Sequence, residues 1–131
     1  MKILIVDDDF MSRNLLLEVL KDYGTIHIAT EGKEAVEAVR VAMVSGKPYN
    51  LICLDIMMPK MDGQQALRKI RDMEEADGIT STNGAKIIMT TALGNPKNAI
   101  TSFKSLCDGY VVKPIDISKL QDELRKLKLV K

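Results

Sequence analysis

The sequence predicts an α/β fold in which a five-stranded parallel sheet is covered by helices on both faces. Short apolar runs alternate five times with segments whose apolar residues recur at helical spacing. Strict alternation of this kind is typical of a parallel sheet, because each strand needs a helical crossover before the next one can start at the same edge. The length of 131 residues suits one hydrophobic core. We therefore expect a single domain over residues 1–131, with no output domain after the last helix.

The strands are recognised as short apolar runs bounded by polar or turn residues. They are expected at residues 2–6, 25–29, 50–54, 86–90 and 110–112. The second of them alternates polar and apolar side chains, which indicates a half-exposed strand at the edge of the sheet. With five strands in this alternation, the common arrangement is the doubly wound, flavodoxin-like order 2-1-3-4-5, whose ligand crevice lies at the carboxyl ends of the first and third strands.

Five helices are expected, at residues 11–21, 33–44 and 63–75, from Asn95 onward and from about Asp116. Asn95 is a cap residue, and Pro96 follows it at the first helical position. Segment 76–84 is polar and is expected to be a long turn. Helical spacing predicts the following inward-facing residues, helix by helix: Met11, Leu15, Leu16, Val19 and Leu20; Val36, Val39, Ala42 and Met43; Ala66, Leu67, Ile70 and Met73; Ala99, Ile100, Phe103 and Leu106; Ile117, Leu120, Leu124 and Leu127.

Acidic residues follow the two strands whose ends should form the crevice. The run Asp7-Asp8-Asp9 follows the first strand, and Asp55 follows the third. A carboxylate at the end of a buried strand is costly to desolvate unless something pairs with it. Several carboxylates in one crevice repel one another and call for a divalent cation. Hard oxygen ligands in small number suit Mg²⁺, which keeps several of its waters.

Two further strand ends carry groups that suit phosphoryl chemistry. Thr91 follows the fourth strand and Lys113 the fifth. A carboxylate beside Mg²⁺ can attack phosphorus and form an aspartyl phosphate, and an ammonium and a hydroxyl would then neutralise and bind the new oxygens. Thr90 is the alternative to Thr91 if the register differs by one residue.

Four strings, ILIVDDD, LICLDIMMPKMDG, IIMTTA and DGYVVKP, resemble the receiver domains of two-component response regulators, in the same order and spacing along essentially the whole chain. The resemblance implies phosphorylation of Asp55 by a histidine kinase or a histidine phosphotransfer protein. It also implies roles for other residues, with Mg²⁺ held by Asp7, Asp8, Asp55 and the main-chain carbonyl of Met57, a switch pair of Thr91 and Tyr110, a phosphate-binding Lys113, and a Lys113–Pro114 bond that is usually cis.

Simpler roles remain open for several of these residues. Asp7, Asp8 and Asp9 could be an N-terminal charge cluster of a helix, and Tyr110 could be a packing aromatic. Asp62, which precedes Gly63, is expected to be a turn or cap residue rather than a ligand.

The favoured function is a stand-alone phosphoryl-acceptor switch that catalyses only its own phosphorylation and dephosphorylation. The face made by the fourth helix, the fifth strand and the last helix, including Lys104, Tyr110 and Lys119, is the expected surface for a downstream protein. Met57 and Leu93 lie two residues after Asp55 and Thr91, where a polar side chain could orient a hydrolytic water. Because neither can do so, we expect a long-lived phosphorylated form.

Two other functions fit the sequence less well. A Mg²⁺-dependent phosphohydrolase with an Asp nucleophile would place a second Asp where this chain has Met57. A flavin mononucleotide carrier would need a Ser/Thr/Gly-rich phosphate loop after the first strand, where this chain has three aspartates.

The composition argues against other classes of function. A net charge of +1 gives no electrostatic case for nucleic acid. No segment resembles a signal peptide, and the apolar runs are too short for membrane insertion. The two cysteines have no metal-ligand spacing, so a reduced, cytoplasmic location is expected.

Overall fold

The structure is a computed structural model that describes residues 1–58, 61–80, 83–91 and 106–130. Its centre is a parallel sheet with the strand order β2-β1-β3-β4-β5, as predicted. All four pairs of neighbouring strands are parallel, so the carboxyl ends of the strands meet at one edge. The strands are β1 (Lys2–Val6), β2 (Thr25–Ala29), β3 (Leu51–Asp55), β4 (Lys86–Thr91) and β5 (Gly109–Val112).

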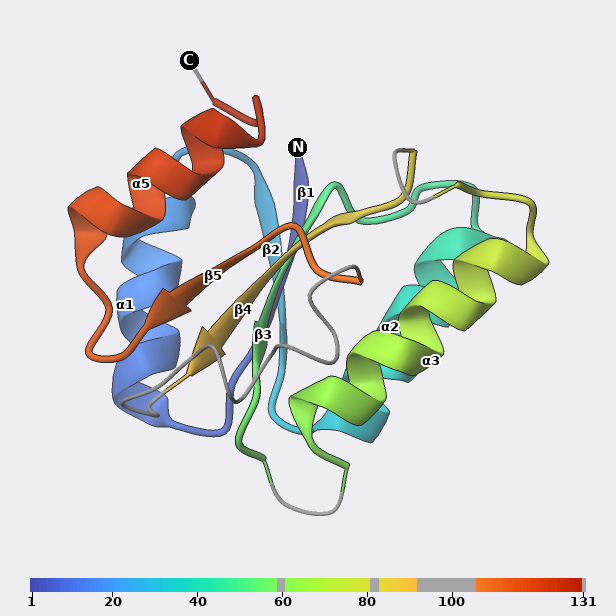
Figure 1. The fold of residues 1–131 in the computed structure, drawn as a ribbon, viewed down its shortest axis with the longest axis horizontal. Helices are drawn as coiled ribbons and strands as arrows, with labels where there is room; N and C mark the ends of the chain where they lie inside the picture. The colour runs from blue at the N-terminus through green and yellow to red at the C-terminus, as the bar shows by residue number, and fades with distance from the viewer. Residues whose placement is uncertain (59–60, 81–82, 92–105, 131) are drawn as a thin grey trace.

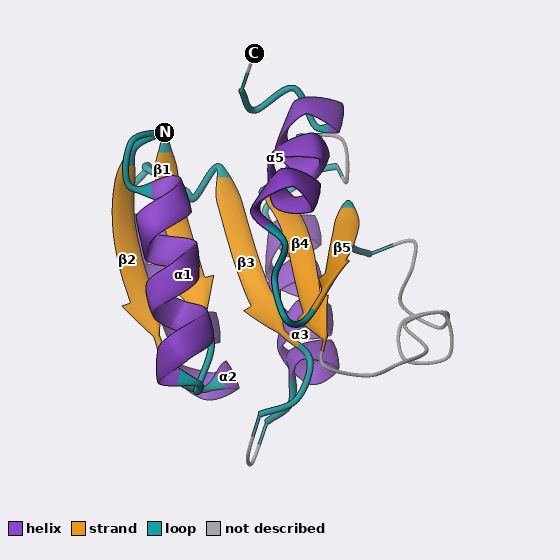
Figure 2. Ribbon diagram, turned by 90° about the vertical axis from the view of Figure 1, so that its left-hand side faces the viewer, coloured by secondary structure: helices purple, strands orange, loops and turns teal. Residues whose placement is uncertain are grey.

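Four helices cover the sheet in the described part of the chain. They are α1 (Phe10–Leu20), α2 (Gly32–Val44), α3 (Gly63–Ala76) and α5 (Ile117–Lys126). Helices α1 and α5 lie on one face of the sheet, and α2 and α3 lie on the other (Figures 1 and 2). The helix predicted from Asn95 onward lies outside the described residues. None of the described helices has the length and apolar character needed to span a bilayer.

Aspartates cap three of these helices. The side chains of Asp9, Asp62 and Asp116 accept hydrogen bonds from backbone N–H groups in the first turns of α1, α3 and α5. Asp62 also forms a reciprocal capping box with Gln65. The expectation that Asp62 is a cap residue is therefore confirmed, and the third aspartate of the acidic run, Asp9, starts α1 rather than lining the crevice.

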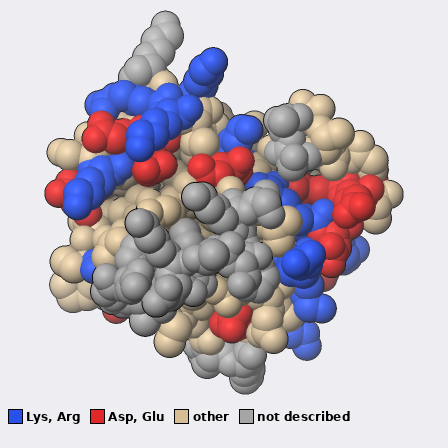
Figure 3. Space-filling view, viewed as in Figure 1, with Lys and Arg blue, Asp and Glu red and all other residues tan. Residues whose placement is uncertain are grey.

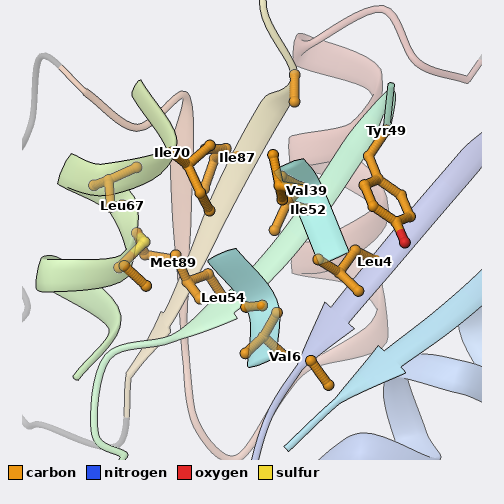
Figure 4. Packing of buried hydrophobic residues seen from close by; sticks show 14 of the residues in the cluster. Leu4, Val6, Val39, Tyr49, Ile52, Leu54, Leu67, Ile70, Ile87 and Met89 are labelled. Atoms are coloured by element: carbon orange, nitrogen blue, oxygen red, sulfur yellow. The ribbon is translucent and has the colours of Figure 1, made fainter. Parts of the chain in front are cut away.

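The sheet separates two hydrophobic clusters. One, between the sheet and helices α2 and α3, is drawn in Figure 4 and includes Leu54, Leu67 and Met89. The other lies between the sheet and helices α1 and α5 and includes Cys53 and Leu120. Successive residues of a strand point to opposite faces, so β3 and β4 contribute side chains to both clusters. Because both faces of these strands are buried, their sequences are nearly continuous apolar runs.

Of the helix residues that were predicted to face inward and that the structure describes, two are exposed. Met11 is 77% exposed and Ile117 is 46% exposed. Both lie in the first turn of their helices. In α1 only Leu16 and Leu20 are fully buried, and these two are one helical turn apart.

A buried charge network ties α3 to the opposite, amino edge of the sheet. The Arg71 guanidinium lies 2.7 Å from Glu74 and 2.9 Å from Asp108. It also donates to the carbonyl oxygens of Ala85 at 2.8 Å and Leu106 at 2.7 Å. Because each carboxylate is paired and also accepts a backbone N–H, the network anchors both β4 and the segment before β5 to α3.

Candidate functional site

The candidate site is an acidic pocket at the carboxyl edge of the sheet. Strand β1 ends at Val6, which is paired with Leu54 of β3, so the next residues, Asp7 and Asp55, lie side by side. Asp7 is fully buried and Asp55 is 2% exposed, whereas Asp8 is exposed at the mouth of the pocket. One carboxylate oxygen from each of the three lies within 4.8 Å of the others. The structure therefore brings together the acids that the sequence predicted would meet.

Lys113 bridges the two buried carboxylates. Its Nζ lies 3.0 Å from Oδ2 of Asp7 and 3.4 Å from Oδ2 of Asp55. The lysine follows β5, so its side chain crosses β4 to reach β3 and β1. The Lys113–Pro114 peptide bond is cis, as the resemblance implied.

The charges of the site perturb one another. Burial, together with the negative charge of Asp7, raises the pKa of Asp55 to about 6, against an opposing effect of Lys113. Burial by itself lowers the pKa of Lys113, but the hydrogen bond with Asp7 and the charges of Asp55 and Asp7 outweigh it and raise that pKa. The ammonium therefore stays charged, and a further cation would stabilise the charged form of Asp55.

Backbone groups fix the positions of the carboxylates. The Met57 N–H donates to Oδ1 of Asp55 at 3.2 Å, and the Asp9 N–H donates to Oδ1 of Asp7 at 2.9 Å. The loop after β3 returns so closely that a Cβ on Gly63 would lie 2.1 Å from the Asp55 carbonyl oxygen. Only glycine fits this approach, which holds the start of α3 against the end of β3.

The donor set of the pocket fits Mg²⁺. The carboxylates of Asp7, Asp8 and Asp55 are hard oxygen ligands, and their spacing allows one ion to contact all three. Among the described residues, Oδ2 of Asp7 is buried without a hydrogen bond and is balanced only by the charge of Lys113. An added cation would balance this charge further. The main-chain carbonyl of Met57 is the expected fourth ligand. The N–H of the same residue donates to Asp55. Binding of Mg²⁺ by the Met57 carbonyl stays a prediction.

Thr91 is the last residue of β4 and is fully buried. Its carbonyl oxygen accepts a hydrogen bond from the Lys113 N–H at 2.6 Å, which couples the end of β4 to the segment that carries the lysine. The residue paired directly with Asp55 is Thr90. Strand alternation therefore places Thr90 on the face that carries Asp55, while Thr91 lies one step further along the edge.

Two other predicted site residues, Met57 and Tyr110, are partly exposed. Met57 is 57% exposed, next to Asp55. Tyr110 is 38% exposed on β5, beside a groove shared with Lys119 of α5. Figure 3 shows Lys and Arg side chains gathered over α5, interleaved with acidic ones. Leu93 and Lys104, and hence the fourth-helix part of the expected partner surface, lie outside the described residues.

One residue beside the site was missed from the sequence. Arg13 donates from Nη1 to the main-chain oxygen of Asp7 at 3.1 Å, and its guanidinium lies 5.6 Å from the centre of the Phe10 ring. The arginine lies one turn into α1, so it can reach back toward the end of β1. Arg13 lies six residues after Asp7 in the sequence. This spacing predicts the contact only when the start of α1 at Phe10 is known.

This fold and this pocket define a class, namely α/β proteins with an acidic site and a lysine at the carboxyl edge of the sheet. The model of the response regulator receiver domain family matches residues 3–125. The chain belongs to this family, as the four sequence strings indicated.

Curated relatives agree with this assignment. The chain is 33% identical over 123 residues to the chemotaxis protein CheY of Halobacterium salinarum, which covers 94% of this chain and 92% of the relative. It is 40% identical over 114 residues to the transcriptional regulatory protein SrrA of Staphylococcus aureus, but these cover 86% of this chain and only 42% of that protein. The likeness therefore extends along CheY, and along less than half of the transcriptional regulator.

Solved structures share the fold. A chain of the CheX–CheY–BeF3–Mg complex from Borrelia burgdorferi matches with a TM-score of 0.81 and 27% identity, over 100% of this chain and 90% of that one. The receiver domain of the histidine kinase CKI1 from Arabidopsis thaliana, in complex with Mg²⁺ and BeF3, matches with a TM-score of 0.79 and 27% identity, over 97% of this chain and 89% of that one.

Proposed function

We propose that this protein is a stand-alone response regulator that accepts a phosphoryl group on Asp55 in a Mg²⁺-dependent reaction. The observation that carries the proposal is the position of Asp55, which is buried at the end of β3, 3.4 Å from the Lys113 ammonium and grouped with Asp7 and Asp8. The likeness to CheY along nearly its whole length supports the stand-alone form.

The donor in this proposal is a phosphohistidine of a histidine kinase or a histidine phosphotransfer protein. A carboxylate oxygen of Asp55 attacks the phosphorus and forms the new P–O bond. The P–N bond to the donor imidazole breaks, and the nitrogen keeps the electron pair. The Lys113 ammonium lies where it can neutralise the phosphoryl oxygens as they enter the pocket.

The chain itself supplies three things to this reaction. Asp7, Asp8 and Asp55 would hold Mg²⁺, which supplies positive charge that offsets the charge of the phosphoryl oxygens. The Met57 N–H holds Oδ1 of Asp55, so the nucleophile is already oriented. Thr91, by the resemblance, supplies a hydroxyl to the phosphoryl group and with Tyr110 forms the switch.

Phosphorylation then biases the face that joins β5 and α5 and so changes the binding of a downstream protein. Tyr110 and Lys119 line a groove on this face. The proposal includes no reaction on any other substrate, because Met57 stands where a phosphohydrolase would need its second acid. It also includes a cytoplasmic location, as for other partners of histidine kinases.

Phosphorylation with a small donor tests the proposal. The purified protein is incubated with MgCl2 and acetyl phosphate, and intact-mass spectrometry counts the phosphoryl groups added. We expect one group on the wild type and none on Asp55→Asn, because an amide is not a nucleophile at neutral pH. Asp62→Asn is the matched control, since it changes an aspartate that caps α3 into another good cap residue. Equal labelling of Asp55→Asn and the wild type would refute the assignment.

A further inference from the structure

A buried hydroxyl beside Asp55 has no hydrogen-bond partner among the residues that the structure describes. Thr90 is 1% exposed, and its Oγ1 makes no hydrogen bond within the described part of the chain. Leaving a buried hydroxyl unpaired destabilises a folded protein, and a valine of the same shape would avoid that cost. Neighbouring positions of β4, such as Ile88 and Met89, carry apolar side chains. Packing alone therefore does not explain why this position carries a threonine and not a valine.

The register of the sheet places Thr90 beside Asp55. Thr90 is the direct Cα partner of Asp55, and their main chains are joined by the hydrogen bond from the Ile56 N–H to the Thr90 carbonyl at 2.9 Å. Paired residues of adjacent strands point to the same face and lie about 5 Å apart. Two residues earlier, Cys53 and Ile88 both pack into the cluster under α1 and α5, so this face is the one that Thr90 and Asp55 share.

Lys113 reaches the same carboxylate from beyond β4. It belongs to the segment after β5, and its Nζ lies 3.4 Å from Oδ2 of Asp55 on β3. Thr90 belongs to β4, the strand between β5 and β3.

The unphosphorylated site already uses the oxygens of Asp55. Oδ1 accepts the Met57 N–H at 3.2 Å, and Oδ2 lies 3.4 Å from the Lys113 ammonium. A phosphoryl group on Asp55 would bring additional oxygen acceptors, carrying negative charge, into the same small space. Hydrogen bonds to charged acceptors are stronger than those to neutral ones.

We propose that the Thr90 hydroxyl donates a hydrogen bond to the phosphorylated Asp55 side chain and so stabilises the phosphorylated state over the unphosphorylated one. This inference rests on the proposed function and extends it to a second hydroxyl, distinct from that of Thr91. In this proposal the Thr90 hydroxyl has no acceptor in the unphosphorylated state and gains one when Asp55 is phosphorylated.

Two measurements on Thr90→Val and Thr90→Ser test the inference. Urea unfolding in EDTA measures the unphosphorylated protein, and calorimetric titration with beryllofluoride in excess MgCl2 measures affinity for a phosphoryl mimic. We expect Thr90→Val to be at least as resistant to urea as the wild type, yet to bind beryllofluoride about tenfold more weakly. Thr90→Ser keeps the hydroxyl and should bind as the wild type does.

The outcomes separate this inference from the function it rests on. If the wild type fails to bind beryllofluoride, the proposed function is wrong and the inference falls with it. If the wild type binds and Thr90→Val binds equally well, the inference alone is wrong. Lower urea resistance of Thr90→Val would also overturn it, since the hydroxyl would then have a partner in the resting protein.

Discussion

The Lys113 ammonium lies 3.0 Å from Oδ2 of Asp7, which is fully buried. The two residues are more than a hundred positions apart in the sequence, and their strands are separated by β3 and β4. A buried carboxylate without a cation is strongly unfavourable. Lys113 is therefore both a phosphate-binding candidate and the group that makes the acidic pocket compatible with the folded state.

Removing the Lys113 ammonium should destabilise the protein in a pH-dependent way. We expect Lys113→Met to lower the free energy of unfolding by about 3 kcal/mol at pH 7, because Asp7 and Asp55 are left together without their cation. The loss should shrink at pH 5, where protonation of Asp55 removes one charge. Urea unfolding at both pH values measures this. Lys119→Met, at an exposed position of α5, is the control, and a loss equal to that of the control would contradict the prediction.

Replacing Asp55 by asparagine should stabilise the unphosphorylated protein. Its pKa of about 6 lies above the usual 3.8, so the folded state binds a proton more readily than the unfolded one. The charged carboxylate therefore costs stability above pH 6, and this cost disappears as the pH falls toward 4. We expect Asp55→Asn to gain about 2 kcal/mol at pH 7 in EDTA and nothing at pH 4. Urea unfolding at the two pH values would contradict this if the gain were the same at both.

Asp8 should account for most of the Mg²⁺ affinity. Because it is exposed at the mouth of the pocket, Asp8→Ala should leave the free energy of unfolding nearly unchanged while it removes most of the binding. Asp9→Ala is the matched control, since Asp9 caps α1 through Ser12 and its loss should cost about 1 kcal/mol of stability without changing Mg²⁺ affinity. Mg²⁺ titration followed by NMR measures the affinity of each variant. A larger loss of affinity in Asp62→Ala than in Asp8→Ala would show that Asp8 is not the main ligand.

The phosphorylated form should last for minutes or longer. Met57 is exposed beside Asp55, and its thioether cannot orient a water for attack on phosphorus. Met57→Asn should therefore speed the release of inorganic phosphate several-fold, and Leu93→Glu, at a position outside the described residues, should add to the effect. Val41→Asn, on the exposed side of α2, is the control. Decay of the wild type within seconds, or no change in the double variant, would contradict the prediction.

The Arg71 network should affect stability but not phosphorylation. Arg71→Met would leave Glu74 and Asp108 as largely buried, unpaired acids, so we expect a loss of 3 kcal/mol or more, on the order of that for other broken buried ion pairs. Arg68→Met, exposed on the same helix, should have little effect. Labelling by acetyl phosphate should stay normal in both variants while they are folded, because the network lies at the edge opposite Asp55. Loss of labelling by a folded Arg71→Met would show coupling between the two edges.

The strands and most helix faces could be predicted because periodicity and caps are local signals. The acidic pocket was also predictable, because strand order alone brings Asp7 and Asp55 to one edge. Periodicity could not show that Met11 and Ile117, each in the first turn of its helix, are exposed, because burial depends on neighbours that are distant in the sequence. The ion pair of Arg71 with Asp108, 37 residues away, has no local signature at all.

The separation of the two hydrophobic clusters by the sheet has a consequence for mutational robustness. Among the described residues, Leu67 under α2 and α3 and Leu120 under α1 and α5 belong to separate hydrophobic clusters on opposite faces of the sheet. Their substitutions should therefore combine additively in unfolding experiments. A cavity on one side cannot be filled by a larger residue on the other, so the two halves of the protein can accumulate sequence changes independently while the shared edge keeps its chemistry.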